Sequence, residues 1–203
     1  MSATNYVFDV GNVLVDWNPH YLFRKMFPDD AAIDAFLAEI GFHTWNLEQD
    51  RGRSFAQGGE MLAERFPHHR AAIVSYGPRF QEAISDAIHG TVDILTELRD
   101  SGAPLYAITN FNQDTFRETQ KRFPFLTWFR DVVVSGDERL VKPDPEIYRV
   151  LFRRNGLAPE TCLFIDDSPK NVDAAEAVGM KAIRFTSPAA LRKALADHRR
   201  AAA

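Results

Sequence analysis

The amino-acid sequence predicts an α/β fold: a three-layer Rossmann-like parallel sheet with a small helical domain inserted after its first strand. Two observations lead to this prediction. Short apolar runs alternate with amphipathic helical segments over most of the chain, and several of these runs end in polar side chains. Regular alternation of strands and helices is typical of a parallel sheet that helices cover on both faces.

Five strands are expected, because five short runs are rich in aliphatic, aromatic and β-branched residues. They lie near residues 6–9, 105–108, 131–134, 162–165 and 182–185. Capping residues and first-turn prolines mark the starts of the connecting helices, at Thr91, Asp144-Pro145, Ser168-Pro169 and Ser187-Pro188. Glycines mark their ends, at Gly102, Gly156 and Gly179.

Residues 16–86 have a different pattern. Apolar residues recur there at helical spacing in 31–40 and in 55–66, and no convincing strand lies between Pro19 and Phe80. We therefore expect a core domain formed by residues 1–15 and 87–203, and a helical domain formed by residues 16–86. The terminal Ala201-Ala202-Ala203 is expected to be disordered.

Composition narrows the functional classes. The 203 residues are 45% hydrophobic and 26% charged, with a formal net charge of −4, which is typical of a globular protein and offers no basic patch for nucleic acid. The single cysteine, Cys162, lies in an apolar run, so a buried, inert thiol is expected. No apolar run approaches the ~20 residues of a membrane helix, and no signal sequence is recognisable. These features predict a cytoplasmic, soluble protein.

Polar residues at the strand ends indicate one shared site. Asp9 ends the first strand, Thr109-Asn110 ends the second, and Asp166-Asp167 ends the fourth, with Lys142-Pro143 between the last two. Ligands of such sheets bind outside the carboxyl ends of the strands. Carboxylates grouped there favour a hard cation such as Mg²⁺, which also relieves their mutual repulsion. A carboxylate in this position can attack phosphorus and form an aspartyl-phosphate.

In this order, the segments Asp9-Val10-Gly11-Asn12-Val13-Leu14, Thr109-Asn110, Lys142-Pro143 and Asp166-Asp167 resemble the four motifs of the haloacid dehalogenase-like hydrolase superfamily. The resemblance covers essentially the whole chain, and the helical insertion matches the family's cap. It is strongest to the branch that contains bacterial sugar-phosphate phosphatases. The resemblance implies an Mg²⁺-dependent phosphatase, with Mn²⁺ as a second possible ion, that acts on a small phosphorylated metabolite.

The resemblance also implies roles for individual residues. Asp9 is the expected nucleophile and a metal ligand, with Gly11 lending its carbonyl oxygen and Asp167 completing the protein ligands. Thr109 and Asn110 are expected to hold the phosphoryl group, and Lys142 to steady Asp9 and the transferring charge. Asp166 and Asn171 are expected to orient these groups from behind.

One position departs from the family pattern. Most phosphatases of this superfamily carry a second aspartate two residues after the nucleophile as general acid, and this chain has Gly11 there. Its absence favours a substrate with a weakly basic leaving oxygen, such as an anomeric or acyl phosphate. Alternatively, another residue supplies the proton; the candidates are His43, Glu48, Asp50 and Asp16. Arg51 either meets a phosphate or sugar acid, or pairs with Asp50.

Two other functions remain open from the sequence. A metal-independent 2-haloacid dehalogenase uses an equivalent aspartate and also lacks the second aspartate, although it has no need of the further acids Asp166 and Asp167. A non-catalytic small-molecule-binding module on the same fold is the second alternative.

The adjacent His68 and His69 lack nearby ligands in the sequence and are assigned no role. Trp17 and Trp45 are expected in the core more than at a substrate. Nothing in the sequence indicates an oligomeric state.

Overall fold

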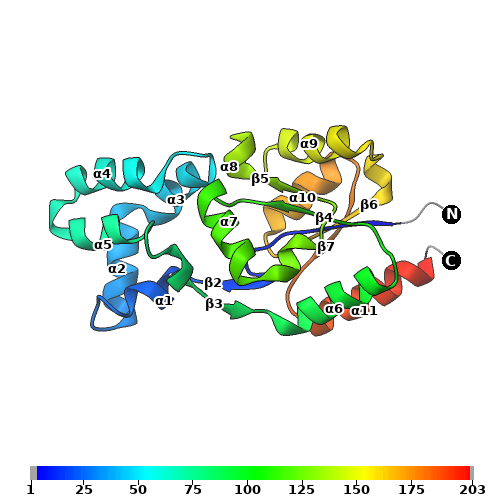
Figure 1. The fold of residues 1–203 in the computed structure, drawn as a ribbon, viewed down its shortest axis with the longest axis horizontal. Helices are drawn as coiled ribbons and strands as arrows, with labels where there is room; N and C mark the ends of the chain where they lie inside the picture. The colour runs from blue at the N-terminus through cyan, green and yellow to red at the C-terminus, as the bar shows by residue number, and fades with distance from the viewer. Residues whose placement is uncertain (1–3, 202–203) are drawn as a thin grey trace.

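A five-stranded parallel sheet forms the centre of the larger lobe in the computed structural model, which describes residues 4–201 (Figure 1). Its strand order is β5-β4-β1-β6-β7. The strands are β1 (Asn5–Phe8), β4 (Leu105–Thr109), β5 (Asp131–Val134), β6 (Cys162–Asp166) and β7 (Lys181–Arg184). The predicted α/β class and all five predicted strands are therefore confirmed, with shifts of one or two residues at their ends.

Alternate residues of the strands point to opposite faces of the sheet, as the two-residue period of a strand requires. Val7, Tyr106 and Phe164 belong to the apolar cluster beneath α9 (Pro145–Asn155) and α10 (Pro169–Ala177). Phe8 and Ala107 belong to the cluster on the other face, which α6 (His89–Asp100), α7 (Gln113–Arg122) and α11 (Pro188–Ala201) cover. The three central strands, β4, β1 and β6, are thus buried on both sides, which fits their nearly continuous apolar sequences.

Most predicted helix boundaries match the structure. Asp144 caps α9 through its side chain, which accepts a hydrogen bond from the backbone N–H of Glu146, and Gly156 ends that helix with φ of +62°. The prediction for Thr91 was wrong: α6 begins at His89, and Thr91 lies buried within its first turn. The side chain of Ser168 does not cap α10, although that helix begins at the next residue as predicted.

The smaller lobe, called the helical lobe below, consists of five α-helices. They are α1 (Pro19–Phe23), α2 (Asp30–Ile40), α3 (Phe42–Asp50), α4 (Phe55–Arg65) and α5 (Arg70–Ser75). As predicted, none of the described residues between Pro19 and Phe80 forms a strand. The sequence did not reveal a short antiparallel pair, β2 (Val15–Trp17) and β3 (Ile84–Ala87), which joins this lobe to the sheet (Figure 1).

Short helices complete the fold: α8 (Ser135–Glu138) and the 3₁₀ helices Pro67–His69, Phe80–Ala83, Pro124–Thr127 and Pro159–Thr161. Of the terminal alanines, Ala201 is the last residue of α11, so the prediction of disorder is wrong for it. Ala202 and Ala203 lie outside the described residues.

Aromatic side chains fill the helical lobe. Tyr76 is fully buried and packs against Phe23, Phe42, Trp45 and Phe80, at ring-centroid distances of 5.0 to 5.8 Å. Phe80 in turn packs edge-to-face on Phe111, which follows β4, at 5.3 Å. The apolar interior of the helical lobe therefore continues into the core beneath one face of the sheet.

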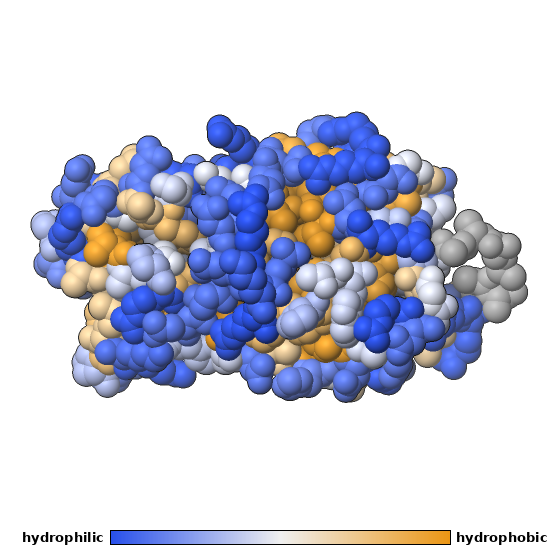
Figure 2. All heavy atoms as spheres, in the orientation of Figure 1, coloured by the Kyte–Doolittle hydropathy of each residue, from blue (hydrophilic) through white to orange (hydrophobic). Residues whose placement is uncertain are grey.

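Hydrophilic residues cover most of the face drawn in Figure 2, and the hydrophobic residues show mainly between them. The large apolar side chains exposed among the described residues are Met26 and Met61, both in or near the helical lobe. None of the helices between residues 4 and 201 combines the length and the apolar character needed to cross a bilayer.

Candidate active site

The carboxyl ends of three adjacent strands bring the predicted residues together. β1 lies between β4 and β6 in the sheet. Asp9 follows β1 directly, Thr109 is the last residue of β4, and Asp166 is the last residue of β6. Because parallel strands end at the same edge, residues more than 150 positions apart in the sequence become neighbours here.

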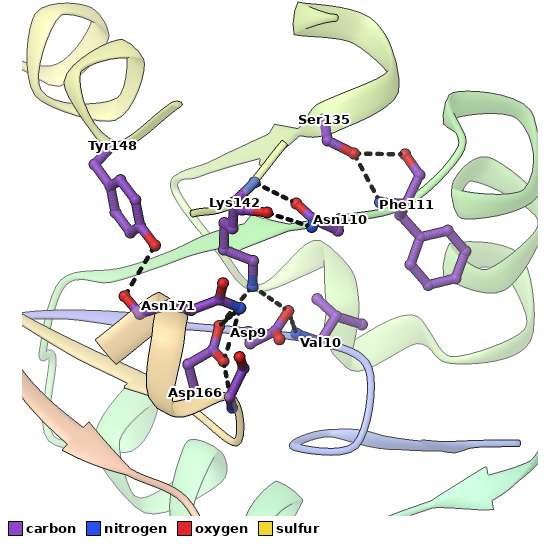
Figure 3. A network of polar contacts seen from close by, with 10 residues as sticks. Asp9, Val10, Asn110, Phe111, Ser135, Lys142, Tyr148, Asp166 and Asn171 are labelled. Atoms are coloured by element: carbon purple, nitrogen blue, oxygen red, sulfur yellow. Dashed lines mark hydrogen bonds and ion pairs between the residues drawn. The ribbon is translucent and has the colours of Figure 1, made fainter. Parts of the chain in front are cut away.

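Lys142 joins two of the acids. Its Nζ lies 2.8 Å from Oδ1 of Asp9 and 2.7 Å from Oδ2 of Asp166, and the lysine side chain is 1% exposed (Figure 3). The backbone N–H of Val10 also donates to Oδ1 of Asp9, at 2.7 Å. Oδ2 of Asp9 accepts no hydrogen bond from the described residues, so it is the oxygen that remains available for a ligand or for attack.

Asp166 is fully buried, and polar groups surround its carboxylate. The side-chain amide of Asn171 donates to both oxygens, at 3.0 and 3.1 Å, and the backbone N–H of Ser168 donates to Oδ1 at 2.8 Å. The hydroxyl of Tyr148 donates to the backbone carbonyl of Asn171 at 2.9 Å (Figure 3). These contacts fix the orientation of Asp166 and, through it, the position of the Lys142 ammonium.

The side chain of Asn110 holds the backbone of Lys142. Its Oδ1 accepts from the N–H of Lys142 at 2.7 Å, and its Nδ2 donates to the carbonyl of the same residue at 3.0 Å. Only the backbone N–H of Asn110 is left for a phosphoryl oxygen. The Oγ1 of Thr109 is buried and has no hydrogen-bond partner among the described residues.

A cavity of about 190 Å³ opens above these residues. Its walls include Asp9, Gly11, Asn110, Lys142, Asp167 and Asn171, all of them predicted site residues. Of the predicted core residues, Thr109 and Asp166 lie behind this wall rather than in it. The remaining lining residues are Asn12, Trp17, Asn46, Asp50, Phe80 and Phe111.

Of the candidates Glu48, Asp50 and Arg51 from the helical lobe, the structure brings only Asp50 to this cavity. Glu48 and Arg51 lie on the outer side of α3 and form an exposed ion pair with each other, at 2.9 Å. Arg51 therefore pairs with Glu48 and not with Asp50, and it does not line the cavity. Residues 48 and 51 are three apart and share one helix face, whereas Asp50 points to the other.

The two remaining proton-donor candidates also lie elsewhere. His43 is exposed and lines a different hollow, between α1 and α2. Oδ2 of Asp16 accepts hydrogen bonds from the hydroxyls of Tyr21, at 2.7 Å, and Ser85, at 2.6 Å. Neither residue lines the cavity that contains Asp9.

Burial dominates the electrostatics of the site. It raises the pKa of Asp9 to about 8 against the opposing attraction of Lys142, and it also raises the pKa of Asp167, where the neighbouring Asp166 adds to the effect. For Lys142, burial lowers the pKa, but Asp166 and Asp9 outweigh burial and leave the pKa above its usual value. Three acids thus share one cation, and at neutral pH the cluster binds a proton or requires a further positive charge.

The residues present fit a divalent cation. Asp9, Asp166 and Asp167 each offer a carboxylate oxygen, and these three oxygens lie within 4.8 Å of one another. Asp166 already has hydrogen bonds to both oxygens, whereas Asp9 and Asp167 face the cavity beside the backbone of Gly11. Hard oxygen donors with room for water are the ligands that Mg²⁺ prefers.

Several residues near the site were missed in the sequence. Asn12 has a φ of +56°, and its Oδ1 accepts from the backbone N–H of Trp17 at 3.1 Å, so it shapes the turn after Asp9. Asparagine tolerates this conformation, which was the available signal. Phe80, Phe111 and Asn46 gave no such signal, because aromatic and amide residues occur throughout the chain. Trp17 lines the cavity, whereas Trp45 is buried in the helical lobe as predicted.

The structure also gives His68 and His69 a partner that the sequence did not indicate. Nε2 of His68 lies 2.9 Å from one oxygen of Glu39, and Nε2 of His69 lies 3.0 Å from the other. The hydrogen bonds to His69 and His68 lower the pKa of Glu39. This group is on the surface of the helical lobe, far in the chain from the strand-end residues.

Comparison with known proteins identifies the family. The model of the haloacid dehalogenase-like hydrolases matches residues 4–179. Sesquiterpene phosphatase astK of Aspergillus oryzae is 25% identical over 89% of this chain and 88% of its own length. Phosphoglycolate phosphatase 1 of Pseudomonas aeruginosa is 25% identical over 89% of this chain and 68% of its own length.

A solved structure has the same fold. The haloacid dehalogenase family enzyme bt-2542 of Bacteroides thetaiotaomicron superposes with a TM-score of 0.72 at 21% identity, over 92% of this chain and 95% of that one. The same enzyme has been crystallised with magnesium and with inorganic phosphate. The match of the family model over most of the chain, together with the ordered strand-end residues, shows that this protein belongs to the haloacid dehalogenase-like hydrolases.

Proposed function

We propose that this hydrolase is a magnesium-dependent phosphatase that releases phosphate from a small phosphorylated metabolite, a sugar phosphate, through an aspartyl-phosphate on Asp9. The observation that carries the proposal is the buried Asp9, which pairs with Lys142 at 2.8 Å and lies within metal-sharing distance of Asp167. The relatives named as phosphatases support phosphate chemistry.

The residues divide the work as follows. Lys142 and the N–H of Val10 hold Oδ1 of Asp9, so Oδ2 attacks phosphorus in line with the leaving oxygen. Lys142 offsets the negative charge of the transferring group, and the backbone N–H of Asn110 binds one of its oxygens. We assign the hydroxyl of Thr109, which lies directly behind the cavity wall without a hydrogen-bond partner among the described residues, to the same group once substrate is bound. Water then hydrolyses the aspartyl-phosphate and returns Asp9 to its starting state.

Asp9, Asp167 and the carbonyl of Gly11 would hold the cation, while Asp166 and Asn171 orient these groups. When bound, the ion neutralises negative charge on the phosphoryl oxygens and lowers the proton affinity of Asp9. Mg²⁺ is our first choice, because the comparable enzyme bt-2542 was crystallised with it. Mn²⁺ prefers the same oxygen ligands and is the second choice.

We assign residues 1–15 and 87–203 to the catalytic core and residues 16–86 to a cap that closes the cavity and excludes water. The cavity wall contributed by residues 16–86 supports this division, because Trp17 and Phe80 offer apolar surface while Asn46 and Asp50 offer hydrogen bonds. A wall that mixes aromatic and polar groups suits a sugar ring. A cytoplasmic location remains a prediction of the sequence.

The dehalogenase alternative rests on Gly11, which removes the usual acid of the phosphatases. Carbon chemistry without a metal gives no reason for grouping Asp166 and Asp167 beside Asp9, since each added carboxylate makes the nucleophile harder to ionise. The binding-module alternative does not explain why a buried lysine, Lys142, contacts the carboxylate of Asp9. Phosphatase chemistry uses all of these groups.

The deciding experiment measures phosphate release from p-nitrophenyl phosphate and from a sugar-phosphate panel, with Mg²⁺ or with EDTA. A parallel assay follows chloride release from 2-chloropropionate. We expect phosphate release that requires both Mg²⁺ and Asp9, so Asp9→Asn should be inactive; Glu48→Gln, which changes an exposed acid, is the matched control. Chloride release that survives EDTA would replace the phosphatase proposal with the dehalogenase.

A further inference from the structure

The helical lobe contributes a carboxyl group to the wall of the cavity that contains Asp9 and Lys142. Asp50 is the last residue of α3, is 8% exposed and lines that cavity. Burial raises the pKa of its carboxyl to about 7, although contacts with Asn112 and Asn46 oppose the shift. At neutral pH a large fraction of Asp50 therefore carries a proton.

The carboxyl of Asp50 has no cation to stabilise its charged form. Asp9 and Asp166 pair with Lys142, whereas Asp50 forms no ion pair with any residue between 4 and 201. The charged groups that share its cavity are Lys142 and the acids Asp9 and Asp167. Asp50 also lies at the carboxyl end of a helix, where the helix dipole disfavours a negative charge. Both features favour the neutral, proton-donating form.

The core holds this residue in place. The hydroxyl of Ser135, directly after β5, donates to the backbone carbonyl of Asp50 at 2.6 Å and accepts from the N–H of Phe111 at 2.9 Å. Figure 3 shows the Ser135 and Phe111 contact beside Asn110 and Lys142. The side chain of Asn112 donates to the carbonyl of Gln49 at 3.1 Å. The loops that position the catalytic lysine thus also position Asp50.

Anchoring α3 does not explain the carboxyl group. Ser135 binds the backbone of Asp50, which any residue at this position would supply. The side chain makes a separate contact: its Oδ2 accepts from the amide of Asn46 at 3.1 Å. A buried acid at a helix carboxyl end is unfavourable for stability, so its presence beside the cavity needs another reason.

Gly11 leaves a place for a proton donor unfilled. A Cβ at Gly11 would have no heavy atom within 4 Å, and the backbone there does not require glycine. The structure therefore has room for an acidic side chain at residue 11, and the core lacks a proton donor there only because the residue is glycine. Gly11 and Asp50 line the same cavity, from the core and from the helical lobe respectively.

We propose that Asp50 is the general acid of the reaction, placed by the helical lobe where the core has only Gly11. When Oδ2 of Asp9 bonds to phosphorus, the bond from phosphorus to the leaving oxygen breaks, and that oxygen takes the proton of Asp50 and departs as an alcohol. The Asp50 carboxylate then accepts a proton from the water that attacks the aspartyl-phosphate. Phosphate leaves, Asp9 is released, and Asp50 is protonated again. This inference rests on the proposed phosphatase function.

The test compares Asp50→Asn with the natural protein on two kinds of ester. p-Nitrophenyl phosphate has a weakly basic leaving group that needs little protonation, whereas glucose 6-phosphate and fructose 6-phosphate have strongly basic ones. We expect kcat on the better sugar phosphate to fall by about 10²- to 10⁴-fold, and kcat on p-nitrophenyl phosphate by less than about tenfold. Glu48→Gln, on the exposed face of the same helix, should change neither rate.

A second variant tests the role independently of how well Asp50→Asn folds. Gly11→Asp restores an acid from the core, so the loss caused by Asp50→Asn on the sugar phosphate should shrink at least tenfold in the Gly11→Asp background. A purely structural role for Asp50 predicts equal losses on both esters and no rescue, which would overturn the inference.

The two proposals fail in different ways. If the natural protein releases phosphate from no ester, both are wrong. If it hydrolyses p-nitrophenyl phosphate and a sugar phosphate with Mg²⁺ and Asp9, but Asp50→Asn slows both esters equally, the phosphatase proposal holds and only the assignment of Asp50 is wrong.

Discussion

The ammonium of Lys142 lies 2.8 Å from Oδ1 of Asp9, in a place where neither side chain is more than 12% exposed. Lys142→Met removes the cation that lies between Asp9 and Asp166 and leaves these two buried acids without a positive charge nearby. We expect loss of phosphatase activity and a free energy of unfolding lower by about 3–5 kcal/mol, the usual effect of breaking a buried pair. Urea denaturation measures the change in the free energy of unfolding, and release of phosphate from p-nitrophenyl phosphate measures the activity.

Mg²⁺ serves as the internal control for that variant. Added Mg²⁺ should restore part of the lost stability, because it also neutralises the acids, but it should not restore activity. A Lys142→Met protein as stable as the natural one without metal would show that the acids are neutral in the folded state.

Metal binding should be visible without catalysis. We expect Mg²⁺ to bind the folded chain and not the unfolded one, so a concentration 100 times its Kd should stabilise the protein by about 2.7 kcal/mol. We expect Asp167→Asn to abolish this Mg²⁺-dependent rise of Tm, since it removes a ligand that faces the cavity. Asp173→Asn, on the α-helix after Asp167, is the control and should keep the rise. An unchanged rise in Asp167→Asn would place the ion elsewhere.

The raised pKa of Asp50 predicts how stability depends on pH. Its carboxyl ionises near 3.8 in the unfolded chain and near 7 in the folded one. Between these values the folded state binds the extra proton, so the contribution of Asp50 to the free energy of unfolding decreases as pH rises through this window, by on the order of 4 kcal/mol.

Asp50→Asn cannot ionise and should lack this decrease. Other titrating groups act in both proteins, so the readout is the difference between them: relative to the natural protein, the variant should gain stability from pH 5 to pH 8. Chemical denaturation at both pH values measures the difference. Parallel pH profiles would show that Asp50 titrates normally.

Two glycines of the helical lobe should respond differently to alanine. Gly41 has a φ of +64° and open space around its Cβ position, so Gly41→Ala carries only the backbone strain of about 1–2 kcal/mol. At Gly52 the φ is +97°, and a Cβ would lie 2.6 Å from the carbonyl oxygen of Gly136. Gly52→Ala should therefore destabilise the protein by several kcal/mol.

Gly52→Ala should also reduce activity, because it pushes the end of α3 away from α8, which contains Gly136, and moves Asp50 with it. Gly41→Ala should keep its activity. The measurements are the free energy of unfolding and kcat for each variant; equal effects of the two substitutions would mean that the approach of Gly52 to Gly136 is not required.

The strands and the strand-end residues could be predicted from the sequence because their signals are local. An apolar run ending in Asp9 or Asp166 indicates both a buried strand and the edge where it ends, and the parallel sheet places such edges together. The same reasoning predicts that Lys142 lies near these strand ends, but it does not predict which acids Lys142 contacts. Its two contacts depend on the fold of the loop that Asn110 holds, which no local pattern indicates.

Residues of the helical lobe could not be placed in this way. Glu48, Asp50 and Arg51 lie within four positions of one another, and the sequence gives all three the same claim to the site. Which of them faces the cavity depends on how α3 docks on Ser135 and Asn112, more than 60 positions away. The β2–β3 pair was missed for a related reason, since strands of three and four residues are too short to show a period.

The ring of Phe80 packed on Phe111 has a consequence for how the molecule comes apart. Because the aromatic interior of the helical lobe and the apolar layer under one face of the sheet form a single cluster, neither can lose its packing without exposing the other. The two lobes should therefore melt in one cooperative transition, and opening of the cavity should proceed by small shifts of side chains and loops instead of by detachment of a lobe.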